Sequence, residues 1–246
     1  MTKPHFYGKN LSQIHDSDFG FFAEGASQGI LEILKKHNIH NGHIVDLGCG
    51  SGILAKNLTA YGYSITGVDL SPDMIALAKK NVPNAHFITS SFYSVDIPPS
   101  ATVTATGECF NYLFDDFNSM SMIKALFRRI YNSLNQGGLF IFDFAMPGRV
   151  ESSKKKNWNR DNWEMKVKHH EDNELNILTR NITLKFNNES GKNEEQETHH
   201  LRLFEKEEFK SLLLKTGFKP EFVNGYGSYS FPIEKGYGGF VAKKCE

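Results

Sequence analysis

The chain has 246 residues, of which 39% are hydrophobic and 23% charged, so its composition is that of an ordinary folded protein. Lys plus Arg and Asp plus Glu both number 28, and this zero net charge lacks the basic excess that nucleic-acid binding through phosphates usually requires. Its three cysteines are far apart, and no apolar run approaches the length of a membrane span or a signal peptide. We therefore expect a cytoplasmic protein without nucleic-acid or membrane partners and without a disulfide framework or a zinc site.

Short apolar runs alternate with helical patterns over the first 145 residues. Residues 1–18 are polar with scattered aromatic side chains, and helical spacing of apolar residues begins at Phe19 and continues to Lys36. The expected strands are 43–47, 63–69, 85–88, 101–106 and 139–144, and the expected helices are 53–60, 71–80 and 120–134, the last closed by Gly137 and Gly138. This alternation predicts an α/β domain with a parallel sheet and right-handed crossovers.

The composition changes after residue 147. Residues 148–204 are polar, and alternating patterns at 163–167 and 177–183 predict antiparallel strands, with a turn at 187–192. A helix over 206–216 and strands at 218–223 and 238–242 then return to the first sheet. We expect four parts: an N-terminal lid with the first helix (1–38), a core (39–147), an inserted β-ribbon (148–204), and a C-terminal helix with closing strands (205–246).

The strongest motif is Val45-Asp46-Leu47-Gly48-Cys49-Gly50-Ser51-Gly52, between a predicted strand and a predicted helix. Glycines at such a turn let a ligand approach the backbone closely. Asp46 would repel a pyrophosphate but attract a cationic ligand. The spacing also differs from the dinucleotide pattern, because Ile53 stands where a third glycine is needed. The turn therefore favours a cationic ligand.

Asp69 ends the second predicted strand, 21 residues after Gly48. An ionised carboxylate there can accept hydrogen bonds from both hydroxyl groups of a ribose. The alternative is that Asp69 is a solvent-facing strand end or a helix cap. Together with the glycine turn, the position favours the ribose.

These segments, with 67–75, 107–113 and 137–143, resemble the class I S-adenosylmethionine-dependent methyltransferases, and look most like bacterial members that act on small molecules. The resemblance implies an α/β, Rossmann-like, seven-stranded and mostly parallel sheet with helices on both faces and the last strand antiparallel. It also implies a small inserted antiparallel β-ribbon after the fifth strand. The implied cofactor is S-adenosyl-L-methionine, and the implied reaction is metal-independent methyl transfer to N or O of a small-molecule acceptor.

Transferred onto this sequence, the family pattern places the methionine part against the glycine turn, the ribose on Asp69 and the adenine on Leu70 and Met74. In many relatives an acid after the third strand binds the adenine amino group, whereas this chain has Ser91 and Phe92 there. The expected cofactor-binding residues are Asp46, Gly48, Cys49, Gly50, Gly52, Asp69, Leu70, Met74, Ser91, Phe92 and Gly107.

An acceptor that carries a proton needs a base nearby, and the expected catalytic residues are Glu108, His15, Asp16, Asn111 and Tyr112. Glu108 follows the fourth strand, where open α/β sheets place their ligands, although it could also be an exposed loop acid. In this family the N-terminal segment commonly covers the donor, so His15 and Asp16 could orient an acceptor. Alternatively, an Asp or Ser there caps the first helix.

Several aromatic and basic residues of the ribbon, among them Trp158, Arg180 and His199, could line the acceptor pocket or a homodimer contact. Tyr226 and Tyr229 either cover the pocket mouth or are half-buried loop aromatics. A sulfonium can also react differently, by intramolecular cyclisation or aminocarboxypropyl transfer, which releases methylthioadenosine. A non-catalytic binding module or a methyltransferase of macromolecules is the remaining alternative.

Overall fold

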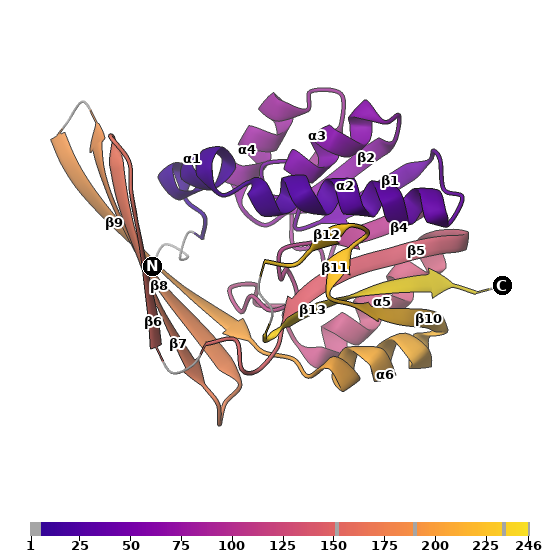
Figure 1. The fold of residues 1–246 in the computed structure, drawn as a ribbon. Coiled ribbons are helices and arrows are strands. Elements are labelled where there is room, and N and C mark those ends of the chain that lie inside the picture. The colour runs from indigo at the N-terminus through magenta and orange to yellow at the C-terminus, as the bar shows by residue number, and fades with distance from the viewer. Residues whose placement is uncertain (1–5, 151–152, 189–190, 233–234, 246) are drawn as a thin grey trace.

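A seven-stranded sheet forms the centre of the computed structural model, which describes residues 6–150, 153–188, 191–232 and 235–245. Its strands are β1 (His43–Leu47), β2 (Ser64–Asp69), β3 (His86–Thr89), β4 (Ser100–Ala105), β5 (Leu134–Ala145), β10 (Phe218–Val223) and β13 (Tyr237–Lys244). The strand order is β10-β13-β5-β4-β1-β2-β3, and β13 runs antiparallel to both β5 and β10 (Figure 1). The expected mostly parallel seven-stranded sheet is confirmed.

Helices cover both faces of this sheet. They are α2 (Phe21–Lys36), α3 (Ile53–Ala60), α4 (Pro72–Asn81), α5 (Met120–Ser133) and α6 (Lys206–Thr216). Buried residues of α2, α3 and α4 share one apolar cluster, and those of α5 and α6 share another. On α5 the buried residues Ile123, Leu126, Phe127 and Ile130 recur at helical spacing, so one stripe of the helix faces the sheet.

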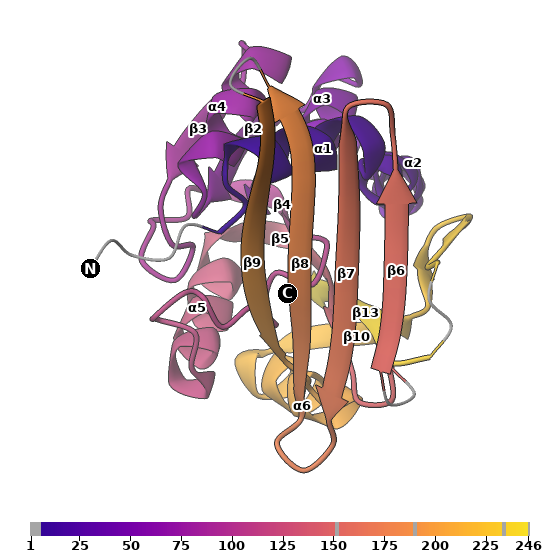
Figure 2. The same cartoon turned by 90° about the vertical axis from the view of Figure 1, so that its left-hand side faces the viewer.

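A second sheet stands beside the carboxyl ends of the core strands (Figures 1 and 2). It consists of β6 (Ser153–Asn159), β7 (Trp163–Asp172), β8 (Ile177–Asn188) and β9 (Gly191–Arg202), all antiparallel, in the order β6-β7-β8-β9. We call this sheet the ribbon. A short hairpin of β11 (Gly225–Tyr226) and β12 (Tyr229–Ser230) precedes β13. The turn expected at 187–192 includes residues 189–190, which lie outside the described residues.

An additional helix, α1 (Lys9–Asp18), lies between the ribbon and the core (Figure 1). Leu11 and Ile14 on its buried side contact an apolar cluster of the ribbon that includes Met165 and Ile182. Because side chains alternate between the faces of a strand, the ribbon offers one apolar face to this helix and to the core. We did not predict this helix, because two apolar residues three positions apart give a weak periodic signal.

Two predicted helix ends were wrong. The helix predicted from Phe19 begins at Phe21, and its N-cap is Gly20, which makes no side-chain hydrogen bond. Asp18 does not cap it but binds Arg160 instead, with 2.9 Å between Arg160 Nε and Asp18 Oδ1.

The helix that we expected to reach residue 134 ends at Ser133, and the glycines that should have closed it belong to β5. Pairing of β5 with β4 shifts register between Ser100↔Leu134 and Thr102↔Leu139, which is a β-bulge. Gly137 has a φ of 74° there, a conformation that glycine adopts easily.

Candidate functional site

A cavity of about 440 Å³ separates the carboxyl ends of β1, β2 and β4 from the ribbon. Its volume falls in the range of small-molecule sites. One half, which we call the donor half, is lined by Asp46, Gly48, Cys49, Gly50, Ser51, Asp69, Leu70, Met74, Phe92, Gly107 and Asp115. The other half, the ribbon half, is lined by residues that include Tyr7, His15, Arg149, Lys156, Trp158, His169, Arg180 and His199.

Backbone hydrogen bonds hold the glycine turn against β2. Gly48 N and Cys49 N both donate to Val68 O, at 2.7 and 3.0 Å. Gly48 has a φ of 74°, and a Cβ there would lie 2.4 Å from Cys109 Sγ, so a side chain does not fit. Asp69 Oδ2 accepts a hydrogen bond from Gly50 N at 2.9 Å, and this bond fixes the Asp69 carboxylate at the cavity wall.

Asp46 is the buried acid of the donor half, with 2% of its surface exposed. Thr104 Oγ1 donates to its Oδ1 at 2.8 Å. The pKa of Asp46 is raised to about 7, because the effects of burial and of the nearby Asp69 carboxylate exceed the opposing effect of the Thr104 hydrogen bond. A positive ligand beside Asp46 would therefore stabilise its charged form.

Glu108 stands where the donor half meets the ribbon half. It has a left-handed backbone with φ of 64°, held because Gly107 N and Glu108 N both donate to the buried carboxylate of Asp143. Its own carboxylate forms ion pairs with Arg149 and with Arg180 Nη2, the latter at 2.6 Å. Burial alone would raise the pKa of Glu108, but the two guanidinium groups outweigh burial and lower it. An ionised carboxylate held in this way is a weak base, so the geometry favours a positioning role.

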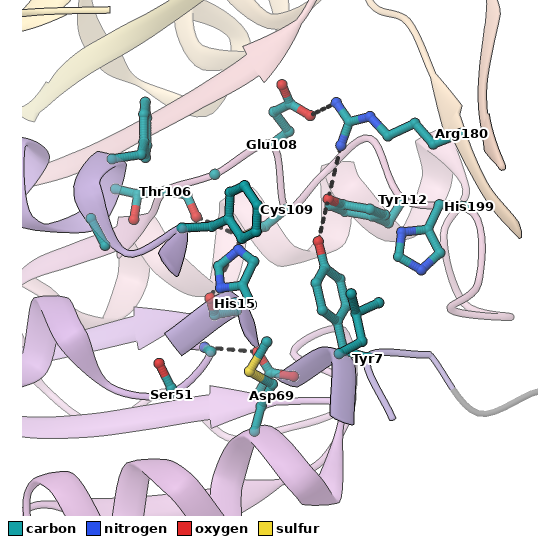
Figure 3. Close-up of a pocket in the computed structure, with 18 of the residues that line it drawn as sticks. Tyr7, His15, Ser51, Asp69, Thr106, Glu108, Cys109, Tyr112, Arg180 and His199 are labelled. Carbon is teal, nitrogen blue, oxygen red and sulfur yellow. Dashed lines mark hydrogen bonds and ion pairs between the residues drawn. The ribbon is translucent and has the colours of Figure 1, made fainter. Parts of the chain in front are cut away.

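A chain of polar side chains leads from Glu108 to the N-terminal segment (Figure 3). Arg180 Nη1 donates to Tyr112 Oη at 3.2 Å, and Tyr112 Oη lies 3.0 Å from Tyr7 Oη. Glu197 on β9 accepts hydrogen bonds from the backbone N–H of Tyr7, at 2.9 Å. The N-terminal segment is thereby attached to the ribbon directly above the cavity.

His15 projects from α1 into the cavity between Asp69 and Glu108 (Figure 3). Its Nδ1 is buried and has no hydrogen-bond partner. Burial lowers the pKa of His15 to about 4, against the opposing charge of Asp16, so the imidazole is neutral near pH 7. A neutral imidazole with an unpaired nitrogen is able to accept a proton or a hydrogen bond.

Comparison with known proteins finds similar sequences for the core of the chain. Residues 44–138 match a family model described as "Methyltransferase domain". A putative methyltransferase of Geobacillus sp. (strain WCH70) is 35% identical over 106 residues, which is 41% of this chain and 41% of that protein. The match therefore spans about two fifths of the length of that relative.

Solved structures resemble nearly the whole chain. An S-adenosylmethionine-dependent methyltransferase from Clostridium acetobutylicum has a TM-score of 0.80 at 19% identity and covers 96% of this chain and 98% of that one. The sugar N-methyltransferase of Streptoalloteichus sp. has a TM-score of 0.75 at 16% identity, with 96% and 92% covered. At these identities the likeness concerns the fold. Residues 44–138 are thus similar to a methyltransferase domain, and nearly the whole chain has the fold of S-adenosylmethionine-dependent methyltransferases.

Not every residue that we expected at the site borders the cavity of this methyltransferase domain. Gly52 is the N-cap of α3 with a φ of 80° and positions that helix. Asn111 is fully buried, and its amide binds Ala145 O at 2.9 Å. Asp16 accepts a hydrogen bond from Asn81 at 3.1 Å. These three residues support the site from outside, and none of them lines the cavity.

Sequence reasoning also missed an acid. Ser91 does not line the cavity, but its hydroxyl donates to Asp115 Oδ2 at 2.6 Å, and Asp115 does line it. The fold thus brings a carboxylate to the cavity wall near Phe92 from the loop after β4. The sequence signal was Ser91 at a position where relatives have an acid, and this serine by itself does not reveal that Asp115 is its partner.

Both interpretations of Tyr226, as a cover of the pocket mouth and as a half-buried loop aromatic, were wrong. It is fully buried, and its hydroxyl donates to Asp143 Oδ2 at 2.8 Å, so it supports the backbone of Glu108 from below. Within the described residues, no cluster of three or more His, Cys, Asp or Glu side chains is arranged to hold a metal ion. None of the described helices has the length and apolarity needed to cross a membrane.

Proposed function

We propose that the protein transfers the methyl group of S-adenosyl-L-methionine to a nitrogen or oxygen atom of a small molecule, without a metal. The observation that carries this proposal is the continuity of the cavity. Beyond the donor half it extends into the ribbon half, closed by β6–β9 and α1, which leaves room for a second molecule beside the donor. Intramolecular cyclisation of the donor needs no such room.

In this proposal the donor half holds S-adenosyl-L-methionine. Asp69 accepts hydrogen bonds from the ribose hydroxyl groups. Asp46 lies near the positively charged methionine part, which favours the ionised form of the Asp46 carboxyl. Leu70 and Met74 contact the adenine ring. Leu70 is 37% exposed, which is unusual for a leucine at a cavity wall and suits a residue that awaits an apolar partner.

The bound donor supplies a methyl carbon activated by positive sulfur. The protein's task is to align the acceptor with that carbon and to exclude water. His15 accepts a hydrogen bond from the nitrogen or oxygen atom of the acceptor, because its imidazole is neutral and its Nδ1 has no partner. Tyr112 and Tyr7 orient the acceptor through their hydroxyl groups. Glu108 orients Arg149 and Arg180.

Two of the similar solved structures support a small-molecule acceptor. One is a sugar N-methyltransferase, and another, from Micromonospora echinaspora, is an amino pentose methyltransferase with a TM-score of 0.75 at 15% identity. Both have the fold of this chain, and both names describe small amino-group acceptors. An amine of this size is the first class of acceptor to test.

The test combines donor binding with product analysis. Purified protein is titrated with S-adenosyl-L-methionine by calorimetry, then incubated with panels of small amines and alcohols, and products are followed by mass spectrometry. Asp69→Ala should bind the donor about a hundredfold more weakly, since about two charge-assisted hydrogen bonds are lost. Asp161→Ala, an exposed acid of the ribbon, is the matched control and should bind normally.

Formation of S-adenosylhomocysteine together with a methylated amine or alcohol supports the proposal. Consumption of the donor to methylthioadenosine without any methylated product contradicts it, because the methyl group has then stayed on sulfur. Undiminished turnover in the presence of a chelator is expected from a metal-independent reaction. We further propose a cytoplasmic enzyme without a nucleic-acid partner that can form a homodimer through the ribbon, which light scattering of the full chain would detect.

A further inference from the structure

Positive charge gathers on the ribbon half of the cavity. Arg149, Lys156 and Arg180 all line it. Within the described part of the chain, Glu108 is the carboxylate that pairs with the two arginines, and Lys156 forms no ion pair. Three basic groups therefore face one acidic group, and this half of the cavity carries a surplus of positive charge.

The two arginines are held in place from several sides. The Arg149 guanidinium lies over the Tyr237 ring, with 4.9 Å between Cζ and the ring centroid, and its side chain is 10% exposed. The Arg180 side chain is 15% exposed and is fixed by Glu108 and Tyr112. Guanidinium groups fixed in this way present planar sets of donors at little entropic cost.

One donor of this arrangement has no partner. Arg180 Nε is buried without a hydrogen bond, and an unpaired buried donor of a charged group is costly. The surrounding groups also respond to the positive charge. The pKa of His169 is lowered to about 4, mainly by burial and in addition by the positive charges of Arg180, Lys156 and Arg149. The field in this half of the cavity is therefore one that an anion would neutralise.

We infer that the acceptor is a small molecule that carries an oxyanion, either a carboxylate or a phosphate group, and that this group binds between Arg149, Lys156 and Arg180. This inference rests on the proposed function, because it names the acceptor of that same reaction. The apolar wall formed by Trp158, Met165 and Val167 is continuous with the basic groups and contacts the uncharged part of the acceptor.

Lys156 is the residue to change, because it has no ion-pair partner among the described residues whose loss would disturb the fold. Lys155 is the matched control: it is exposed, and alternation along β6 places it on the opposite face of the ribbon. The protein loaded with S-adenosylhomocysteine is titrated by calorimetry with inorganic phosphate and, separately, with acetate. The same titrations are made with Lys156→Gln, Lys155→Gln and Glu108→Gln.

We expect saturable binding of at least one anion to the unmodified protein. Lys156→Gln should weaken it about tenfold, in line with the loss of one charge-assisted contact, and Lys155→Gln should leave it unchanged. Glu108→Gln should bind the anion more tightly, because the two arginines lose their counterion. Stronger binding of phosphate indicates a phosphate-bearing acceptor, and stronger binding of acetate indicates a carboxylate.

Normal loading with S-adenosylhomocysteine but no saturable anion binding would overturn the inference and leave the proposed function intact. Equal anion affinity of Lys156→Gln and the unmodified protein would also overturn it. Failure of the unmodified protein to bind either the donor or S-adenosylhomocysteine would instead count against the proposed function, and anion binding under those conditions would not be acceptor binding.

Discussion

Binding of S-adenosyl-L-methionine should depend on pH through Asp46. Burial holds the pKa of this carboxyl at about 7, so near neutrality much of the free protein carries a protonated Asp46. The bound donor brings positive charge to the same place, and only the ionised carboxylate interacts with it favourably. Donor binding must therefore release a proton from Asp46 when the pH is below its pKa.

The size of the effect follows from that pKa. With a pKa of about 7, roughly one molecule in ten has an ionised Asp46 at pH 6, and roughly nine in ten at pH 8. The affinity for the donor should accordingly fall about tenfold from pH 8 to pH 6, which corresponds to about 1.4 kcal/mol. Asp46→Asn should bind the donor weakly at every pH and lose this dependence.

Calorimetric titrations at several pH values, in buffers of different ionisation enthalpy, measure both the affinity and the proton released. Methylthioadenosine is the matched ligand, because it lacks the sulfonium and amino-acid charges, and its affinity should not change with pH through Asp46. A donor affinity that varies less than threefold between pH 6 and pH 8 would refute the reasoning. The same tenfold dependence in Asp46→Asn would refute it too.

Three further outcomes concern stability, each measured by urea unfolding of the full chain. Asp46→Asn should raise the free energy of unfolding near pH 8. The folded protein holds the Asp46 proton more tightly than the unfolded chain does, so the Asp46 carboxyl lowers stability as the pH rises from about 4 to 7. A loss of stability in this variant near pH 8 would contradict the sign. Gly29→Ala should prevent folding or cost several kcal/mol, because its Cβ would lie 1.8 Å from Tyr226 O, whereas Gly25→Ala should cost less, since its Cβ meets the movable ring of Tyr229. Equal losses in the two glycine variants would count against this packing. Tyr226→Phe should cost about 1–3 kcal/mol by removing a buried hydrogen bond to Asp143, and an unchanged midpoint would show that this bond contributes little.

The donor half could be predicted from the sequence because its determinants are local. Asp46 and the glycine turn follow one strand, and Asp69 ends the next, so the parallel pairing of β1 and β2 is enough to bring them together. The periodicity of the strands and the positions that directly follow them can both be recognised within a segment of about 30 residues. The seven strands and the antiparallel last strand followed from the family resemblance, whereas the strand order came from the structure.

The ribbon half could not be predicted in the same way, because it depends on contacts between distant segments. Glu108 looked like a candidate base until the fold placed Arg149 and Arg180 against it. Ser91 looked like a cofactor contact until its hydroxyl was found on Asp115, 24 residues away. Helix α1 is stabilised largely by burial against the ribbon, so its own sequence signals it weakly.

The two halves of the cavity have different origins along the chain. The family match over 44–138 contains all residues of the donor half, whereas the ribbon half comes from the N-terminal segment and from residues after 148. Such a division allows evolution to exchange the ribbon, and with it the choice of acceptor, while the donor chemistry is inherited unchanged. Glu108 sets a condition for such an exchange. Arg180 of β8 is one of its two counterions, so a replacement ribbon without a cation at the end of β4 would leave Arg149 alone to compensate the buried charge.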